Sequence, residues 1–351
     1  MAQVKLGRRF LLGTAGVGVL AAPAILSGRA HAQTATQAGA QTGAQTGGQT
    51  TGGQTATMDK AMTTQMPPPV DGFKLGDFEV LVVRDGARPS GKPNETFGTN
   101  QSAEAVGELL EENFLPADNF VNSFSPTLVK AGNELVLFDT GFGAAGRANG
   151  MGRLQDGMKL AGYAPEDVTI VVLTHLHGDH IGGLMENGKA AFPNARYVTG
   201  QREYDFWTSA ERAGTPAEGG QKAVMANVKP LAEKMTFIDE GGSIISGITG
   251  MNAFGHTPGH MIYTLESAGR QLVLTADTAN HYVLSLQRPE WEVRFDMDKA
   301  AAAATRKRVF DMLATDKVAF LGYHMPFPSV GFVEKQDSGY RFVPKSYQFD
   351  I

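Results

Sequence analysis

The stretch THLHGDHIGG constrains this chain more than any other feature of its sequence, because it places three histidines and an aspartate within six residues. It follows an apolar run of the kind found in strands buried on both faces. His175 and His177 are two residues apart, so in an extended segment their side chains point to the same side. Gly178 lets the backbone turn, so that Asp179 and His180 need not share that direction. Two adjacent ligand sets with different directions predict a centre for two metal ions.

A centre for two metal ions needs more ligands than this stretch supplies, and the composition limits what they can be. The chain has no cysteine, which excludes thiolate ligands, disulfides, thiolate nucleophiles and iron–sulfur clusters. Any metal must therefore bind histidine and carboxylate. Four of the eight histidines lie outside both the stretch and the N-terminal segment, each beside a turn or at a predicted strand end: His256, His260, His281 and His324. Strand ends are where sheets build sites, because a rigid strand aims a side chain into a cleft.

The net charge argues against a nucleic-acid partner. The 351-residue chain has a formal charge of −5. Four basic residues and no acidic one lie in its first 32 residues, so the remainder has 27 basic and 36 acidic residues, a net charge of −9. An acidic chain of this kind lacks the clustered lysine and arginine that a phosphate backbone requires.

Residues 1–32 resemble a twin-arginine export signal. Arg8 and Arg9 precede a mildly apolar run, and residues 30–32 (AHA) have the small-x-small form of a cleavage site. An uncleaved membrane anchor is the alternative, but the run is short, rich in glycine and interrupted by Pro23. We therefore expect export to the periplasm or the medium, with no stable membrane anchor. The twin-arginine route carries folded proteins, which suits a protein that binds metal before export.

The segment that follows, 33–70, is predicted to be a disordered linker. Most of it is a repeating tract of glutamine, threonine, glycine and alanine, with no charge and no aliphatic side chain larger than alanine across 33–57. Such a tract cannot bury enough apolar surface to offset the entropy lost on ordering. The folded domain is therefore expected over 71–351.

Strands and helices mix within that domain. The patterns predict strands at 78–86, 133–141, 168–174, 196–200, 261–267, 270–277 and 317–324. The strands at 261–267 and 270–277 are expected to form a hairpin. Helices are predicted at 201–212 and 298–313, the second capped by Asp296 or Asp298.

Five motifs in order resemble those of the metallo-β-lactamase superfamily, and the likeness covers nearly all of the chain from Phe73 onward. They are Asp139 in LFDTG, the HLHGDH stretch, His256 and His260 in GHTPGH, Asp277 in TAD, and His324. The resemblance implies an αββα sandwich of the α+β class, with a site at the edge between its two sheets.

The same resemblance implies a role for each motif residue. His175, His177 and His256 would hold one metal ion. Asp179, His180 and His324 would hold the second, with Asp277 bridging the two ions. Asp139 and His260 would orient ligands rather than bind metal.

The ligand types indicate the chemistry. Two divalent ions lower the pKa of a shared water, so a metal-bridging hydroxide can attack a substrate near neutral pH, and they polarise the carbonyl or phosphoryl oxygen attacked. Asp179 could also relay the proton to the leaving group. Zinc fits nitrogen and oxygen ligands best, although Mn²⁺, Co²⁺ and Fe²⁺ accept the same donors.

Within the superfamily, the chain looks most like the branch of methyl parathion hydrolases and acyl-homoserine lactonases, whose members are often exported dimers. Four residues are candidates for the substrate pocket: Phe142, Trp207, Asn280 and His281. Trp207 could instead pack in the core, and Asn280 or His281 could instead cap a turn.

The expected activity is hydrolysis of small-molecule lactones or related esters, such as acyl-homoserine lactones. The alternative is a phosphotriester hydrolase using the same centre. A metal-binding protein without turnover is a third interpretation, and a β-lactamase of the thiol-ligated type is disfavoured by the absence of cysteine. A homodimer is expected from the resemblance alone.

Overall fold

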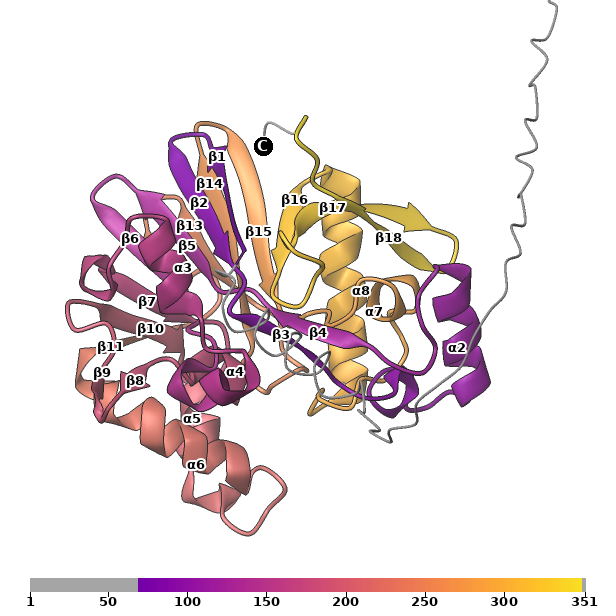
Figure 1. The fold of residues 1–351 in the computed structure, drawn as a ribbon, viewed down its shortest axis with the longest axis horizontal. Helices are drawn as coiled ribbons and strands as arrows, with labels where there is room; N and C mark the ends of the chain where they lie inside the picture. The colour runs from indigo at the N-terminus through magenta and orange to yellow at the C-terminus, as the bar shows by residue number, and fades with distance from the viewer. Residues whose placement is uncertain (1–68, 349–351) are drawn as a thin grey trace, which may run out of the picture. The chain divides into compact units, whose positions relative to one another are not determined.

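A computed structural model describes residues 69–348, shown in Figure 1. The expected export signal and almost all of the expected linker lie outside these residues. The first strand begins at Val70. Within residues 69–348, no helix combines the length and the hydropathy needed to cross a bilayer.

Two seven-stranded sheets form the centre of the domain. The first has the order β1 (Val70–Leu75), β2 (Phe78–Val83), β5 (Thr127–Ala131), β6 (Glu134–Phe138), β7 (Ile170–Leu173), β10 (Arg196–Gly200) and β11 (Met235–Ile238). The second has the order β12 (Ser243–Ile245), β13 (Ile248–Asn252), β14 (Met261–Ser267), β15 (Arg270–Ala276), β16 (Ala319–Gly322), β17 (Val330–Gln336) and β18 (Gly339–Pro344). In the first sheet β6, β7, β10 and β11 run parallel; in the second, β15 and β16 do.

Helices cover the outer faces of both sheets. The helices are α2 (Ala103–Glu112), α3 (Leu154–Leu160), α4 (Gly178–Ile181), α5 (Gln201–Thr208), α6 (Glu218–Asn227), α7 (Leu284–Gln287) and α8 (Lys299–Asp316). Short 3₁₀ turns span Pro93–Glu95, Gly143–Asn149, Pro165–Asp167, Ala210–Arg212 and Lys229–Lys234, and two small ribbons pair β3 (Gly86–Pro89) with β4 (Val121–Phe124) and β8 (Met185–Glu186) with β9 (Lys189–Ala190). Helices α3, α5 and α6 lie beside the first sheet, and α8 lies beside the second (Figure 1).

The apolar run at β7 shows why the sheets stack. Ile170 and Val172 point into the core between the two sheets, whereas Val171 and Leu173 point into the core beneath the helices. A strand apolar on both faces must be covered on both, and a helix layer covers the face that the second sheet does not. The predicted αββα sandwich is confirmed.

The predicted elements are present, with differences at their ends. The strand expected to 141 ends at Phe138, since Asp139 adopts the left-handed conformation, with φ of 59°. The helix expected over 201–212 ends at Thr208, because Ser209 is extended and its side chain accepts a hydrogen bond from the Glu211 N–H. Asp298, not Asp296, caps α8. The hairpin of β14 and β15 is antiparallel as predicted.

Replacing Leu272 by alanine tests the core between the sheets. Leu272 is fully buried there and pairs with Ala319 across β15 and β16. The variant should lose about 2–5 kcal/mol of unfolding free energy, because a cavity remains where the side chain was. Leu160→Ala on α3, where the side chain is 59% exposed, should change it by less than about 0.5 kcal/mol. Urea denaturation measures both, and equal losses would contradict this layer assignment.

Candidate metal centre

Five chain segments bring polar side chains to one edge of the sandwich. The segment after β7 carries His175, His177, Asp179 and His180; the loop between β13 and β14 carries His256; Asp277 follows β15; His324 follows β16; and Asp139 follows β6. Two of these strand ends turn sharply, because Asp139 and Ala276 have positive φ values of 59° and 43°. Strain of this kind at non-glycine residues collects at functional sites.

Three imidazoles form the first group. The Nε2 of His175 lies 3.1 Å from the Nδ1 of His177, and the Nε2 of His256 lies 3.0 Å from the same atom. His175, His177 and His256 can therefore offer one nitrogen each to a common point. These are the residues expected for the first ion.

A carboxylate and two imidazoles form the second group. The Nε2 atoms of His180 and His324 lie 3.6 Å and 3.7 Å from the Oδ2 of Asp179. These three residues, expected for the second ion, also form a cluster that could hold a metal.

Asp277 lies between the two groups. Its Oδ2 is 3.3 Å from the Nε2 of His256 on one side and 3.1 Å from the Nε2 of His324 on the other. Its Oδ1 lies 3.3 Å from the Nε2 of His180. The first group thus has one imidazole and the second has two within reach of the same carboxylate, as a bridging ligand requires.

The outward nitrogens of four imidazoles are held by other acceptors. The Nδ1 of His180 lies 2.8 Å from the Asp139 carboxylate, and the Nδ1 of His324 lies 2.9 Å from the Ser123 carbonyl. The Nδ1 of His256 lies 2.9 Å from Asp296. The Nδ1 of His175 lies 3.1 Å from Thr174 Oγ1, whose own proton goes to Asp139. An outward N–H leaves the inward Nε2 with a lone pair, which is the tautomer that binds metal.

The two residues expected to orient ligands make contacts of that kind. Asp139 accepts hydrogen bonds from the backbone N–H and the hydroxyl of Thr174, and it contacts His180. Both ring nitrogens of His260 face backbone groups. Its Nδ1 lies 3.0 Å from the Ala253 carbonyl, and its Nε2 accepts a hydrogen bond from the N–H of Asp277 at 3.2 Å. His260 therefore has no nitrogen left for a metal, and it positions the backbone of Asp277.

The donor set fits two divalent ions. The Nε2 of His180 and the Oδ1 of Asp277 are buried and have no hydrogen-bond partner in the described part of the chain. Buried polar atoms are rarely left unpaired, so each has the environment of a ligand atom. Five of the seven side chains are buried, whereas His177 and Asp179 are partly exposed. The open side of the centre is therefore at His177 and Asp179.

The pKa shifts separate the two groups. Burial lowers the pKa values of His175 and His177 well below 6.5, and the neighbouring imidazoles act in the same direction. Burial also opposes protonation of His180, but the carboxylates of Asp277 and Asp139 raise its pKa well above 6.5. Burial raises the pKa of Asp139. His175 and His177 therefore stay neutral, the form that binds metal.

Trp207 and Phe142, two of the four candidate pocket residues, pack close to the metal centre. Trp207 is buried in the core beneath α5 and α6, and its ring contacts the His177 ring edge-on at 5.8 Å. Phe142 is half-buried and packs edge-on against Phe124, whose ring in turn contacts His324. Trp207 thus contacts a candidate ligand directly and Phe142 does so through Phe124; both remain predicted pocket residues.

The other two make hydrogen bonds beside Asp277. Asn280 donates to the Asp277 carboxylate at 2.9 Å, and its own Oδ1 is buried without a partner in the described residues. The Nδ1 of His281 accepts from the N–H groups of Val283 and Leu284, each at 3.1 Å. The His281 ring thus caps the first turn of α7.

Three buried charged residues near the centre were not predicted. Glu203 accepts hydrogen bonds from both loops that carry the three-histidine group. Asp85 accepts from the N–H groups of Phe142, Gly152 and Leu154, the last being the first residue of α3. Arg306, fully buried on α8, lies 3.3 Å from Asp296, the acceptor for His256. The sequence held one signal for this arrangement. Two aspartates, Asp296 and Asp298, precede α8, but only Asp298 is needed to cap the helix.

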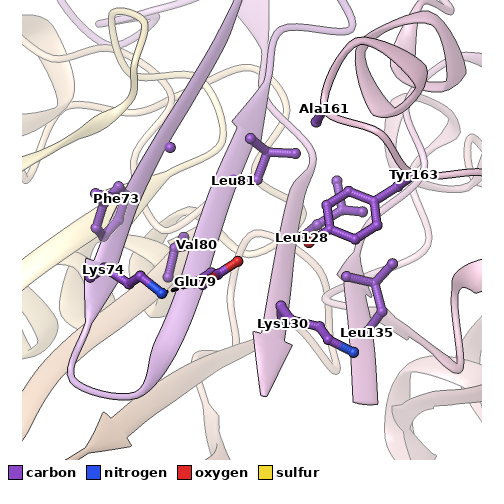
Figure 2. Close-up of a pocket in the computed structure, with 11 residues that line it drawn as sticks. Phe73, Lys74, Glu79, Val80, Leu81, Leu128, Lys130, Leu135, Ala161 and Tyr163 are labelled. Atoms are coloured by element: carbon purple, nitrogen blue, oxygen red, sulfur yellow. Dashed lines mark hydrogen bonds and ion pairs between the residues drawn. The ribbon is translucent and has the colours of Figure 1, made fainter. Parts of the chain in front are cut away.

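The pocket in Figure 2 is separate from this centre. It has a volume of about 360 Å³ and lies on the outer face of the first sheet. Leu81, Leu128, Leu135 and Tyr163 form its apolar wall, with Lys130 at the rim. None of the seven candidate ligands lines it.

Comparison with known proteins agrees with this geometry. The family model of the metallo-β-lactamase superfamily matches residues 125–318, more than half of the chain, so the protein belongs to this superfamily. The chain is 28% identical to an N-acyl homoserine lactonase from Bacillus sp over 173 residues, which are 49% of this chain and 62% of that protein. The aligned region therefore spans less than two thirds of this relative.

Two solved structures match over more of the chain. AidC, a dizinc quorum-quenching lactonase, has a TM-score of 0.75 and 28% identity, covering 81% of this chain and 99% of its own. AbOPH, a hydrolase in the β-lactamase superfamily, has a TM-score of 0.74 and 27% identity, covering 81% of this chain and 100% of its own. The likeness to the metallo-β-lactamase fold and its lactonase branch is thereby confirmed.

His281 should make stability depend on pH. Burial lowers its pKa from 6.5 to about 4, so between these values the unfolded chain binds a proton that the folded chain does not, and stability falls as the pH falls. His281→Asn keeps an acceptor for Val283 and Leu284 but cannot titrate. The loss of unfolding free energy between pH 7 and pH 5 should therefore be about 2 kcal/mol smaller in the variant. Denaturation at both pH values, at equal metal content, measures it; identical losses would contradict the buried neutral ring.

Proposed function

We propose that this protein is a hydrolase that depends on two metal ions and opens lactones of the N-acyl homoserine lactone type. The observation that carries the proposal is Asp277, whose carboxylate lies within 3.3 Å of His256 from one group, and of His180 and His324 from the other. The dizinc lactonase AidC, similar over most of the chain, supports the lactone as substrate class.

Two bound divalent ions would supply a nucleophile derived from water at neutral pH and polarise the carbonyl oxygen under attack. The chain's own part is to hold the ligand side chains in position. Outward hydrogen bonds do so for four of the imidazoles, and Asn280 donates to Asp277. We propose zinc for both sites, because nitrogen and oxygen donors in this ratio suit it.

Asp179 is the residue we propose for proton transfer. Its side chain is 21% exposed, whereas those of His324 and Asp277 are 3% exposed. Its carboxylate therefore faces the open side, where a leaving group would be released. The hydroxyl of Tyr323 donates to the backbone carbonyl of Asp179 at 2.6 Å, and this bond fixes the backbone at that position. A carboxylate on a fixed backbone can take the proton from the attacking water and return it to the leaving oxygen.

The location of the protein and its assembly are further proposals. The arginine pair and the AHA site at the N-terminus support twin-arginine export to the periplasm or the medium. The exported chain would be a homodimer by resemblance to its branch. Its partners would be small molecules, since the net charge of −9 beyond the signal opposes nucleic acid.

Side-by-side kinetics of the zinc-loaded protein test the substrate class. We expect kcat/KM above ~10⁴ M⁻¹s⁻¹ on a long-chain acyl-homoserine lactone, within the usual enzyme range, and a far lower value on a methyl phosphotriester. The reverse order would assign the protein to the phosphotriester hydrolases, which the same centre could serve. Turnover of neither substrate would contradict the proposal.

His177→Ala tests the metal centre itself. His177 is a candidate ligand and is only partly buried, so its loss should abolish lactone hydrolysis while the protein remains folded. Lys222→Ala, at an exposed position on α6, is the matched surface control and should keep full activity. Circular dichroism checks the fold, and hydrolysis at the wild-type rate by His177→Ala would exclude the two-metal assignment.

A further inference from the structure

Glu203, in the first turn of α5, is a fully buried carboxylate with four hydrogen-bond donors around it. Its Oε1 accepts from the N–H of Leu176 at 2.9 Å and from the indole N–H of Trp207 at 2.8 Å. Its Oε2 accepts from the hydroxyl of Thr257 at 2.7 Å and from the N–H of Gly259 at 2.9 Å. Both carboxylate oxygens are therefore saturated by donors from three chain segments.

These donors come from the loops that carry the three-histidine group. Leu176 lies between His175 and His177, and Thr257 directly follows His256. One side chain thus connects two loops that lie far apart in the chain. Their histidines meet, because His177 and His256 are 79 residues apart in sequence and their ring nitrogens lie 3.0 Å apart.

The charge of Glu203 has no cation beside it. Among residues 69–348, no lysine or arginine forms an ion pair with this carboxylate. Burying an unpaired charge costs free energy that hydrogen bonds only partly offset. The donors to Glu203 include Leu176 and Thr257, which directly adjoin the three histidines in the chain. These histidines would hold a divalent cation, and a negative charge near such a cation is favourable.

The backbone also brings the second loop against α5. A Cβ added at Gly259 would lie 2.2 Å from the backbone nitrogen of Glu203, so this position requires glycine. The Trp207 ring, held by Glu203, packs against His177 on the other side. Helix α5 therefore contacts both loops through Glu203 and its neighbours.

We propose that Glu203 is a positioning residue for the three-histidine group: it joins the two ligand loops so that His175, His177 and His256 meet at one metal ion. This inference rests on the metal centre of the proposed function and is independent of the substrate. It predicts that metal affinity, and not only stability, depends on Glu203.

Glu203→Gln is the variant that tests this role. Glutamine keeps the size of the side chain but replaces one accepting oxygen with an NH₂ group, which cannot accept from two of the four donors. Replacing an outer partner of metal ligands typically costs ~10–100-fold in metal affinity. We therefore expect the affinity for one of two Co²⁺ or Zn²⁺ ions to fall by that factor, and the affinity for the other to stay unchanged.

Asp85→Asn is the matched control for a loss of stability alone. Asp85 is also a fully buried carboxylate, and it accepts hydrogen bonds from the backbone N–H groups of Phe142, Gly152 and Leu154. None of these three residues is a candidate metal ligand. This variant should lose unfolding free energy as Glu203→Gln does, but keep both metal affinities.

The measurement is titration of the purified protein with Co²⁺ and Zn²⁺ against a chromophoric chelator, together with the Co²⁺ absorption spectrum and urea denaturation. Thr257→Val removes one of the four donors and serves if Glu203→Gln does not fold; it should weaken the same metal site by a smaller factor. Wild-type affinities and spectra in both variants would overturn the proposal, as would an equal loss in Asp85→Asn. A wild-type protein that binds fewer than two ions would overturn it as well. If the metal affinities of the variants change as predicted but the wild-type protein does not turn over the lactone, only the substrate assignment is contradicted.

Discussion

The site depends on one repeated interaction, a hydrogen bond that the outward N–H of each buried ligand imidazole donates to a fixed acceptor. Asp139, Asp296 and the Ser123 carbonyl each fix one ring of the centre. A neutral imidazole with one nitrogen donating must present a lone pair from the other, so these bonds determine where the metal-binding atoms point. The rest of the structure supports these acceptors: a helix carries Arg306 beside Asp296, and a strand end carries Asp139.

The packing of the sheets explains why these acceptors meet their histidines. Residues such as Val172 and Leu274 bury their side chains between the sheets, so both sheets are held face to face. Parallel pairing of β6 with β7, and of β15 with β16, then places the ends of these strands at one edge. Apolar burial supplies the stability, and polar side chains at the strand ends use the rigid positions that it creates.

Much of the fold followed from local patterns. The doubly apolar run of β7, the alanine-rich α8 and the turn between β14 and β15 are each decided by residues that are close in the sequence. The errors occur at element ends, where one residue changes direction. Asp139 leaves the strand and Ser209 ends α5, because each side chain hydrogen-bonds to backbone that the pattern does not reveal.

The sequence by itself determined the histidine-rich ligand stretch and most strands and helices, because ligand types at short spacing and apolar periodicity are local properties. The αββα layer order and the ligand roles of His256, Asp277 and His324 followed from the resemblance to the superfamily. Only the tertiary structure decided which acceptor holds each ring. Glu203 and Thr257 are 54 positions apart, and Asp85 and Leu154 are 69 apart. No periodicity encodes such pairs, since a buried carboxylate bonds whichever donors the folded backbone brings to it. For the same reason, only the structure shows that His281 caps α7 and that Asp298, not Asp296, caps α8.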